Sequence, residues 1–235
     1  MTELPAATTC QLTVAAVIDL GPRMRRITLA GDPLADFVAL PGQDVVLHLP
    51  DGQGGGLSRR YTIRHLDNQS RRVDLDFVRH GHGPGALWAE SVQAGDPVEI
   101  FGPRGKTPLT AAGWQLFAGD ESAIPAIAEM VSALPSGAHA VALVEVQDAA
   151  DEQLVESDAV VDLRWLHRLT TAPGDADLLD TALQAVAIPD ADRHAYLFGE
   201  SRVVRRLRDH LHGRGLQPAE VSAKGYWNLG RAMRD

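Results

Sequence analysis

Cysteine, lysine and long apolar runs are scarce in this chain of 235 residues. The single cysteine, Cys10, excludes an internal disulfide framework and any zinc or iron–sulfur site that needs several cysteines. No stretch reaches the roughly 18 apolar residues of a membrane span, and the N-terminal segment lacks the basic and apolar regions of a signal peptide. The dinucleotide fingerprint GxGxxG, the P-loop and the HExxH motif are also missing. We therefore expect a soluble cytoplasmic protein without these common sites.

The composition is that of a globular protein, with 45% hydrophobic and 23% charged residues. The formal net charge of −9 argues against a nucleic-acid partner. The charge is uneven, because residues 111–235 carry 11 basic and 19 acidic side chains whereas their last part, 193–235, carries nine basic and four acidic ones. A solvated surface explains this basic C-terminal segment, and binding of a phosphate or an anionic substrate is the alternative.

The first hundred residues contain short apolar segments separated by glycine, proline and aspartate turns. The segments are Leu12–Ile18, Ile27–Leu29, Val45–Leu49, Arg59–Ile63, Val73–Val78 and Val98–Phe101. Short strands at regular spacing predict an antiparallel barrel or sandwich.

The pattern changes after Gly105, where strands and helices alternate. The strands expected are Gln115–Ala118, Val141–Val146, Val160–Leu163 and Ala195–Phe198, and the helices are Ala123–Leu134, Leu178–Val186 and a segment from Val203 that ends at Gly213. This alternation predicts right-handed βαβ units and a parallel sheet. The boundary lies near Leu109–Gly113, which gives one domain over 1–110 and a second over 111–235.

The segment from Ser58 to Arg64 carries the first functional signal. Arg59 can pair with a pyrophosphate, Tyr61 can pack against an isoalloxazine ring, and the Thr62 hydroxyl can reach a ring nitrogen. An arginine-rich edge strand protected against aggregation is the alternative interpretation.

The segment from Val78 to Ala89 carries the second signal. Its dense glycine and proline before a short helical stretch allow backbone N–H groups to approach a phosphate. His80 and His82 are two residues apart, but no acidic or cysteine ligand lies beside them, so we expect no bound metal. A plain turn is the alternative.

Together these motifs resemble the siderophore-interacting protein family of FAD-dependent ferric-siderophore reductases. The matching stretches are Arg59-x-Tyr61-Thr62-x-Arg64, His80–Ala89, Gly95-Asp96 with Gly102–Gly105, Gly119–Ala126, Gly199-Glu200 and Gly225–Gly230. The resemblance implies a ferredoxin-reductase-type fold, in which an N-terminal antiparallel FAD-binding β-barrel precedes a C-terminal parallel-sheet domain that binds a nicotinamide nucleotide. It also implies that the flavin carries the chemistry, with no catalytic side chain.

The resemblance assigns FAD to the first domain. The cofactor-binding residues it implies there are Arg59, Tyr61, Thr62, Arg64, His80, Gly83, Pro84, Gly85 and Ala86. Ala86 stands where related proteins often offer a hydroxyl to the pyrophosphate, so we expect backbone contacts at that position.

The electron donor is assigned to the second domain. Asp120 or Ser122 can cap the helix after the first strand, where small residues leave room for the nicotinamide, and Arg202 can receive the adenosine phosphate. A capped turn and a solvated arginine are the alternatives. NADH, NADPH and a ferredoxin all remain open as donors.

The ferric siderophore is assigned to the C-terminal segment, where Lys224 can supply positive charge beside Tyr226 and Trp227. A solvated lysine is the alternative. We expect a monomeric ferric-siderophore reductase; a general NAD(P)H:flavin or electron-transfer reductase and a non-catalytic siderophore carrier are the other candidates.

Overall fold

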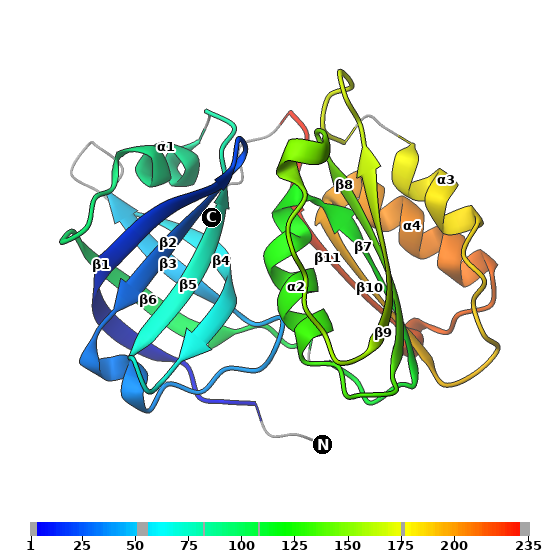
Figure 1. Ribbon diagram of the computed structural model, residues 1–235, viewed down its shortest axis with the longest axis horizontal. Helices are drawn as coiled ribbons and strands as arrows, with labels where there is room; N and C mark the ends of the chain where they lie inside the picture. The colour runs from blue at the N-terminus through cyan, green and yellow to red at the C-terminus, as the bar shows by residue number, and fades with distance from the viewer. Residues whose placement is uncertain (1–3, 51–55, 82, 108, 175–176, 231–235) are drawn as a thin grey trace. The chain divides into compact units, whose positions relative to one another are not determined.

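The computed structural model describes residues 4–50, 56–81, 83–107, 109–174 and 177–230. The chain divides between Leu109 and Thr110 into two compact units, which are described separately here (Figure 1).

The first unit is a closed six-stranded barrel. Its strands are β1 (Thr8–Gly21), β2 (Met24–Ala30), β3 (Asp44–Pro50), β4 (Gly56–Asp67), β5 (Arg72–Val78) and β6 (Pro97–Arg104), in the order β1-β2-β5-β4-β3-β6. Every neighbouring pair is antiparallel. A 3-10 turn, η1 (Asp32–Ala35), follows β2, and the helix α1 (Pro84–Ser91) lies between β5 and β6. The turn spacing predicted a barrel or a sandwich, and the structure confirms the barrel, which the family resemblance also implied.

The alternation of side chains along β5 explains how the barrel core forms. Val73, Leu75 and Phe77 are at most 1% exposed and join one continuous apolar core with residues of the other strands. The outward-facing Asp76 is also buried, because it pairs with Arg26 of β2 through two hydrogen bonds of 2.7 and 2.8 Å. Cys10 lies in the same core, and its burial raises the pKa of the thiol. Cys10 is therefore a packing residue.

The second unit is a five-stranded parallel sheet with helices on both faces. Its strands are β7 (Trp114–Asp120), β8 (His139–Val146), β9 (Val160–His167), β10 (Arg193–Glu200) and β11 (Val221–Trp227), in the order β11-β10-β7-β8-β9. Its helices are α2 (Ile124–Ser132), α3 (Leu178–Gln184) and α4 (Ser201–Gly213), and short 3-10 turns are η2 (Glu121–Ala123), η3 (Ala149–Asp151) and η4 (Pro218–Glu220). Helix α2 covers one face, while α3 and α4 cover the other (Figure 1).

The strand order places a topological switch point between β7 and β10. The chain runs from β7 through β8 to β9 in one direction and then returns to β10 on the other side of β7. Ligands of such sheets bind outside the carboxyl ends of the strands at this point. Asp120 ends β7 and Glu200 ends β10, so these two carboxylates mark the place.

The structure confirms the two-part architecture and corrects several boundaries. The strand expected at Leu12–Ile18 extends over Thr8–Gly21, and the helix expected at Leu178–Val186 ends at Gln184. Strand β11 was missed, because its sequence VSAKGYW contains a lysine and a glycine and shows no clear apolar alternation.

None of the helices in the described part of the chain has both the length and the apolar character needed to cross a membrane.

Candidate functional site

Strand β4 places Arg59 and Tyr61 on one face. Their partners on β3 are Leu47 and Val45, which are completely buried. The Tyr61 ring packs against the barrel core, with its centroid 3.9 Å from that of Phe77. The alternation of the strand thus presents a guanidinium and an aromatic ring side by side.

The Tyr61 phenol lies directly over the start of helix α1. A Cβ atom added at Gly85 would lie 1.9 Å from the Tyr61 Oη, so no other residue fits at position 85 unless Tyr61 moves. The ring has little freedom to move, because Phe77 holds it from one side and in turn contacts Trp88 of α1 at 5.4 Å. A close approach between β4 and the first turn of α1 therefore requires this glycine.

Charge and burial act in opposite directions on the phenol. Burial raises the pKa of Tyr61, whereas the neighbouring Arg59 guanidinium acts to lower that pKa, and burial is the larger effect. Tyr61 is therefore neutral at physiological pH. Arg59 Nη1 donates a 2.7 Å hydrogen bond to the carbonyl of Ser58, which orients the guanidinium along the strand.

Helix α1 begins with backbone groups that suit an anion. Gly83 is the N-cap with φ 76°, and it has no side chain that could cap the helix. A Cβ added at Gly83 would meet no atom of the described residues within 4 Å. The first intrahelical bond runs from the Leu87 N–H to the Gly83 carbonyl. The N–H groups of the first turn therefore have no capping side chain among the described residues, an arrangement that suits an anion.

The other residues expected at this position are less closely grouped. Thr62 is buried on the face of β4 opposite to Arg59 and Tyr61, and its partner on β3 is Asp44. Arg64 is half-buried further along the strand, and His80 is exposed just after β5. His82 lies outside the described residues, so the absence of a metal at the two histidines stays a prediction.

In the second unit, Asp120 is the centre of a buried polar cluster. Its Oδ1 accepts hydrogen bonds from the Ser122 N–H at 2.9 Å and the Ser122 hydroxyl at 2.5 Å. Its Oδ2 accepts from the Glu200 N–H and from the Trp227 Nε1, both at 2.8 Å. Burial raises the pKa of Asp120, and these hydrogen bonds oppose the rise. Asp120 therefore caps η2, the 3-10 turn before α2, whereas α2 itself has no side-chain cap among the described residues. Asp120 also joins the ends of β7, β10 and β11.

Glu200 caps helix α4 with its carboxylate. Its Oε2 accepts from the N–H groups of Arg202 at 2.5 Å and Val203 at 2.9 Å, and its Oε1 accepts from the Leu229 N–H at 3.1 Å. A carboxylate of the chain itself therefore occupies the start of α4. Arg202 is exposed at this position, which leaves its guanidinium available to a ligand.

A second group of buried charges was missed in the sequence. Arg168 forms a bidentate ion pair with Glu121, and its Nη1 lies 3.9 Å from Glu145 Oε1. Glu145 Oε1 has no hydrogen-bond partner among the described residues. Burial raises the pKa of Glu145 to about 7, against the effect of Arg168. The available signal was an acid at the carboxyl end of the apolar strand Val141–Val146.

The three residues expected to bind the substrate share strand β11. Lys224 Nζ lies 5.2 Å from the centroid of the Tyr226 ring, and Tyr226 stacks on Phe198 of β10. Trp227 is bound to Asp120 by its indole and to the Ser201 hydroxyl by its carbonyl, at 2.9 Å. Trp227 is therefore part of the Asp120 cluster, while Lys224 and Tyr226 form a separate pair.

Comparison with known proteins decides the family. The model of the siderophore-interacting protein family matches residues 112–230, and that of the siderophore-interacting FAD-binding domain matches residues 45–107. The chain belongs to the siderophore-interacting protein family. The likeness implied by its motifs is thus confirmed.

Several relatives are similar over nearly their whole length. A siderophore utilization protein from T. fusca superposes with a TM-score of 0.92 at 31% identity, covering 99% of this chain and 97% of that one. The ferric vibriobactin reductase of Vibrio cholerae is 31% identical over 88% of this chain and 84% of its own. The NADPH-dependent ferric-chelate reductase of Escherichia coli is 27% identical over 93% of this chain and 92% of its own.

The residues of the barrel fit the cofactor that the family implies. The protein is a flavoprotein of the oxidoreductase class, and FAD is its cofactor. FAD has an anionic pyrophosphate and a flat aromatic ring. The uncapped start of α1 suits the first, and the Arg59–Tyr61 face suits both.

Proposed function

We propose that this member of the siderophore-interacting protein family reduces iron held in a ferric siderophore, with electrons from a nicotinamide nucleotide. One NAD(P)H supplies a hydride, and therefore two electrons, which reduce two Fe(III) ions in turn. The products are NAD(P)⁺, one proton and two Fe(II) ions. Oxygen ligands hold Fe(II) far more weakly than Fe(III), so reduction releases the iron.

The observation that carries the proposal is the contact between Tyr61 and Gly85. It brings an aromatic ring and the neighbouring Arg59 over a helix start whose N–H groups have no capping side chain. Arg59 and the first turn of α1 bind the pyrophosphate, and Tyr61 orients the isoalloxazine ring. The FAD held by these residues would supply the conversion of a two-electron donor into one-electron steps. Thr62, Arg64 and His80 complete the proposed contacts with FAD.

The donor nucleotide is proposed to bind at the switch point of the second unit. The ends of β7 and β10 lie there, outside which ligands of such sheets bind, and Ser122 and Ala123 beside them are small. Arg202 is the proposed partner of the adenosine phosphate, because it is exposed at the start of α4. Since nicotinamide nucleotides are intracellular donors, the proposal places the protein in the cytoplasm.

The names of the relatives support the substrate. One is a ferric vibriobactin reductase and another is an NADPH-dependent ferric-chelate reductase. Electron transfer to chelated iron needs no acid, base or nucleophile from the protein. This agrees with a barrel whose Tyr61 is held neutral by burial.

Anaerobic reduction of the FAD-loaded protein tests the function. NADH, NADPH or a reduced ferredoxin is added first, and the donated electrons are followed by flavin absorbance. The reduced protein is then mixed with a panel of ferric siderophores, with ferric citrate and oxidised ferredoxin as controls. Rapid reoxidation by one siderophore class supports the proposal. Faster reoxidation by citrate or ferredoxin identifies a general reductase, and absence of reoxidation by any siderophore identifies a carrier.

Substitution of Arg59 tests the position of the cofactor. Charge-assisted hydrogen bonds to phosphate are strong, so Arg59→Ala should lose roughly 1.5–3 kcal/mol of FAD binding, or about ten- to hundredfold in Kd. Purification of the variant with full, tightly held FAD would contradict the assignment.

A further inference from the structure

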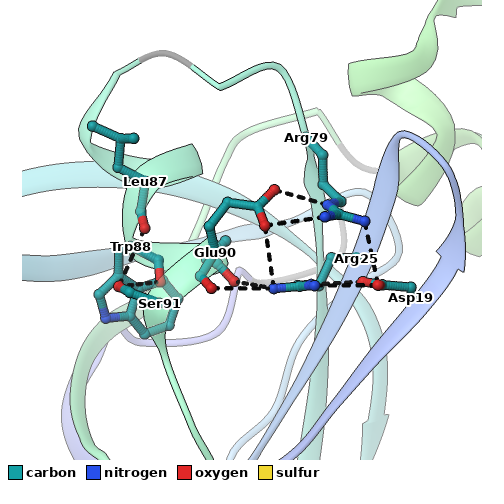
Figure 2. A network of polar contacts seen from close by, with 8 residues as sticks. Asp19, Arg25, Arg79, Leu87, Trp88, Glu90 and Ser91 are labelled. Atoms are coloured by element: carbon teal, nitrogen blue, oxygen red, sulfur yellow. Dashed lines mark hydrogen bonds and ion pairs between the residues drawn. The ribbon is translucent and has the colours of Figure 1, made fainter.

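Four charged side chains lie around the C-terminal end of helix α1 in the barrel unit. Asp19 comes from β1, Arg25 from β2, Arg79 directly follows β5, and Glu90 belongs to α1 itself (Figure 2). We call these four residues the α1 charge network. None of them belongs to the motifs that identify the family, and none contributes to the proposed contacts with FAD.

Arg25 binds the last turn of α1. Its Nη1 donates hydrogen bonds to the carbonyls of Ala89 at 3.0 Å and Glu90 at 3.4 Å, which have no partner inside the helix. The same guanidinium also binds Asp19: Nε donates to Oδ1 at 2.6 Å and Nη2 donates to Oδ2 at 3.2 Å. A cation at this end also interacts favourably with the helix dipole. Arg25 therefore attaches the C-terminal end of α1 to strands β1 and β2.

Arg79 binds the same helix from the other side. Its Nε and Nη2 donate to the two carboxylate oxygens of Glu90 at 2.8 and 3.1 Å, and its Nη1 lies 3.2 Å from Asp19. Its backbone N–H donates to the Arg23 carbonyl at 2.8 Å. Figure 2 shows Arg25 and Arg79 meeting Glu90 and Asp19 from different strands. Arg79, the residue at which the chain leaves β5 for the glycine-rich turn, is thus held by its side chain and by its backbone.

The network adds polar contacts at both ends of a segment whose apolar residues Trp88 and Ala89 pack on the barrel core. Gly81 and Gly83 lie between Arg79 and α1, with φ values of 71° and 76°. A Cβ added at either glycine would meet no atom of the described residues within 4 Å. Helix α1 has only eight residues, too few for a stable helix without tertiary contacts. Arg79 fixes the entrance of this segment, and both arginines fix its exit at Ala89 and Glu90.

We propose that Arg25 and Arg79 are positioning residues for FAD, which hold α1 so that its first N–H groups meet the pyrophosphate. The inference rests on the proposed placement of FAD at this helix. Neither arginine touches the cofactor in this scheme. They act through Glu90 and through the last carbonyls of α1.

An exposed ion pair usually contributes little to stability, because solvent screens it and the side chains lose freedom. The α1 charge network differs in having bidentate geometry and a shared carboxylate on each side. The Arg79 guanidinium lowers the pKa of Glu90, and Arg25 lowers the pKa of Asp19. Both carboxylates therefore stay ionised throughout the neutral range.

The experiment compares FAD affinity in single and double variants of the full chain. The apoprotein of Arg25→Gln, Arg79→Gln, Glu90→Gln and the Arg79→Gln/Glu90→Gln double variant is titrated with FAD, and flavin fluorescence gives Kd. Thermal unfolding of each apoprotein is measured in parallel. Arg71→Gln is the matched control, because Arg71 forms an exposed ion pair with Asp32 in the same barrel, away from α1.

We expect Arg25→Gln and Arg79→Gln to weaken FAD binding by about fivefold to tenfold, the scale of a lost well-formed ion pair. The double variant should bind no more weakly than Arg79→Gln alone, because Arg79 acts through Glu90. Arg79→Lys, which keeps the charge but not the bidentate geometry, should recover part of the affinity. Arg71→Gln should bind FAD like the unchanged protein.

Two results would overturn the inference. One is an unchanged Kd in both Arg25→Gln and Arg79→Gln. The other is a loss of FAD affinity in Arg71→Gln as large as in Arg25→Gln and Arg79→Gln, in proportion to the fall in unfolding temperature of each variant. The placement of FAD is judged separately by Arg59→Ala: if that variant loses FAD while Arg25→Gln and Arg79→Gln keep it, the placement stands and only the positioning role fails.

Discussion

The indole Nε1 of Trp227 donates a hydrogen bond to Oδ2 of Asp120 at 2.8 Å, although 107 residues separate the two in sequence. The same oxygen accepts the Glu200 N–H, so one atom joins the ends of three neighbouring strands. The fit is close, because a Cβ added at Gly199 would lie 2.4 Å from that oxygen and φ at this glycine is 123°. The carboxyl edge of the sheet is therefore organised by a carboxylate.

Replacing this carboxylate by an amide should be costly. In Asp120→Asn one of the two oxygens becomes an NH₂ group, which cannot accept from the N–H donors that Asp120 binds. We expect the free energy of unfolding to fall by about 1–3 kcal/mol, as for a buried donor left without a partner. Urea unfolding of the apoprotein measures the loss.

Asp148 provides the control for Asp120→Asn. Its side chain caps η3 by accepting from the Ala150 N–H at 2.8 Å, but it is exposed. Asn and Asp are nearly equal as caps, so Asp148→Asn should change stability by less than about 0.5 kcal/mol. Equal losses in the two variants would show that only capping matters at Asp120.

Glu145 should make the second unit less stable as pH rises. Burial raises the pKa of this acid from 4.5 to about 7 in the folded state, so between these values the folded chain holds a proton that the unfolded chain has released. The contribution of Glu145 to the free energy of unfolding is therefore fully present below about pH 4.5. It is lost as pH rises through 7, by about 3 kcal/mol in all. Urea unfolding at pH 5 and pH 8 measures the change.

Glu145→Gln should remove this part of the pH dependence, because the amide does not titrate. Relative to the unchanged protein, the variant should gain stability at pH 8 and gain little at pH 5. Glu156→Gln, a substitution at an exposed position of the same unit, should leave the profile unaltered. If the unchanged protein and Glu145→Gln lose stability in parallel between the two pH values, Glu145 is ionised in the folded state.

Gly85→Ala should weaken FAD binding more than it destabilises the barrel. The new methyl group would occupy the position of the Tyr61 phenol, and the ring can yield only by leaving Phe77. We expect FAD to bind at least about tenfold more weakly, the scale of one lost aromatic contact. Gly213→Ala is the control, since a Cβ there meets no atom within 4 Å. Wild-type affinity in Gly85→Ala would show that Tyr61 adapts freely.

Lys224 should contribute charge to the binding of an anionic ferric chelate. Its ammonium lies by the Tyr226 ring, at a partly exposed position. Lys224→Ala should slow reduction of a ferric catecholate by about fivefold at low ionic strength and slow a neutral ferric hydroxamate less, and the difference should shrink in high salt. Lys106→Ala, at the other lysine, is the control. Equal effects on both chelates, or no effect of salt, would make Lys224 a solvated residue.

The sequence predicted the barrel well because its turns carry glycine, proline and aspartate at regular intervals, and it predicted the parallel sheet because strands and helices alternate along the chain after Gly105. It could not predict β11, whose place in the sheet depends on pairing with β10 rather than on its own residues. The pairing of Tyr61 with Gly85 also escaped it, since that contact joins two segments through the curvature of the barrel.

The charged clusters illustrate the same limit. The sequence offered Asp120 or Ser122 as a cap, because the two are neighbours in a turn, whereas the partners of Asp120 at Glu200 and Trp227 are distant in sequence. The sequence did not single out Arg25 and Arg79, because their contacts depend on the geometry of α1. Local chemistry was therefore predictable, and contacts between distant segments were not.

The late position of β11 has a consequence for synthesis of the protein on the ribosome. The barrel has all its strands once Arg104 has emerged, so it can fold and bind its cofactor while the rest of the chain is still being made. The Asp120 cluster receives Trp227 and Leu229 only after the other strands of the second unit have been synthesised. A nascent chain would thus carry FAD before its second unit is complete, and ribosome-bound chains stalled before and after Trp227 should differ in protease resistance in that unit alone.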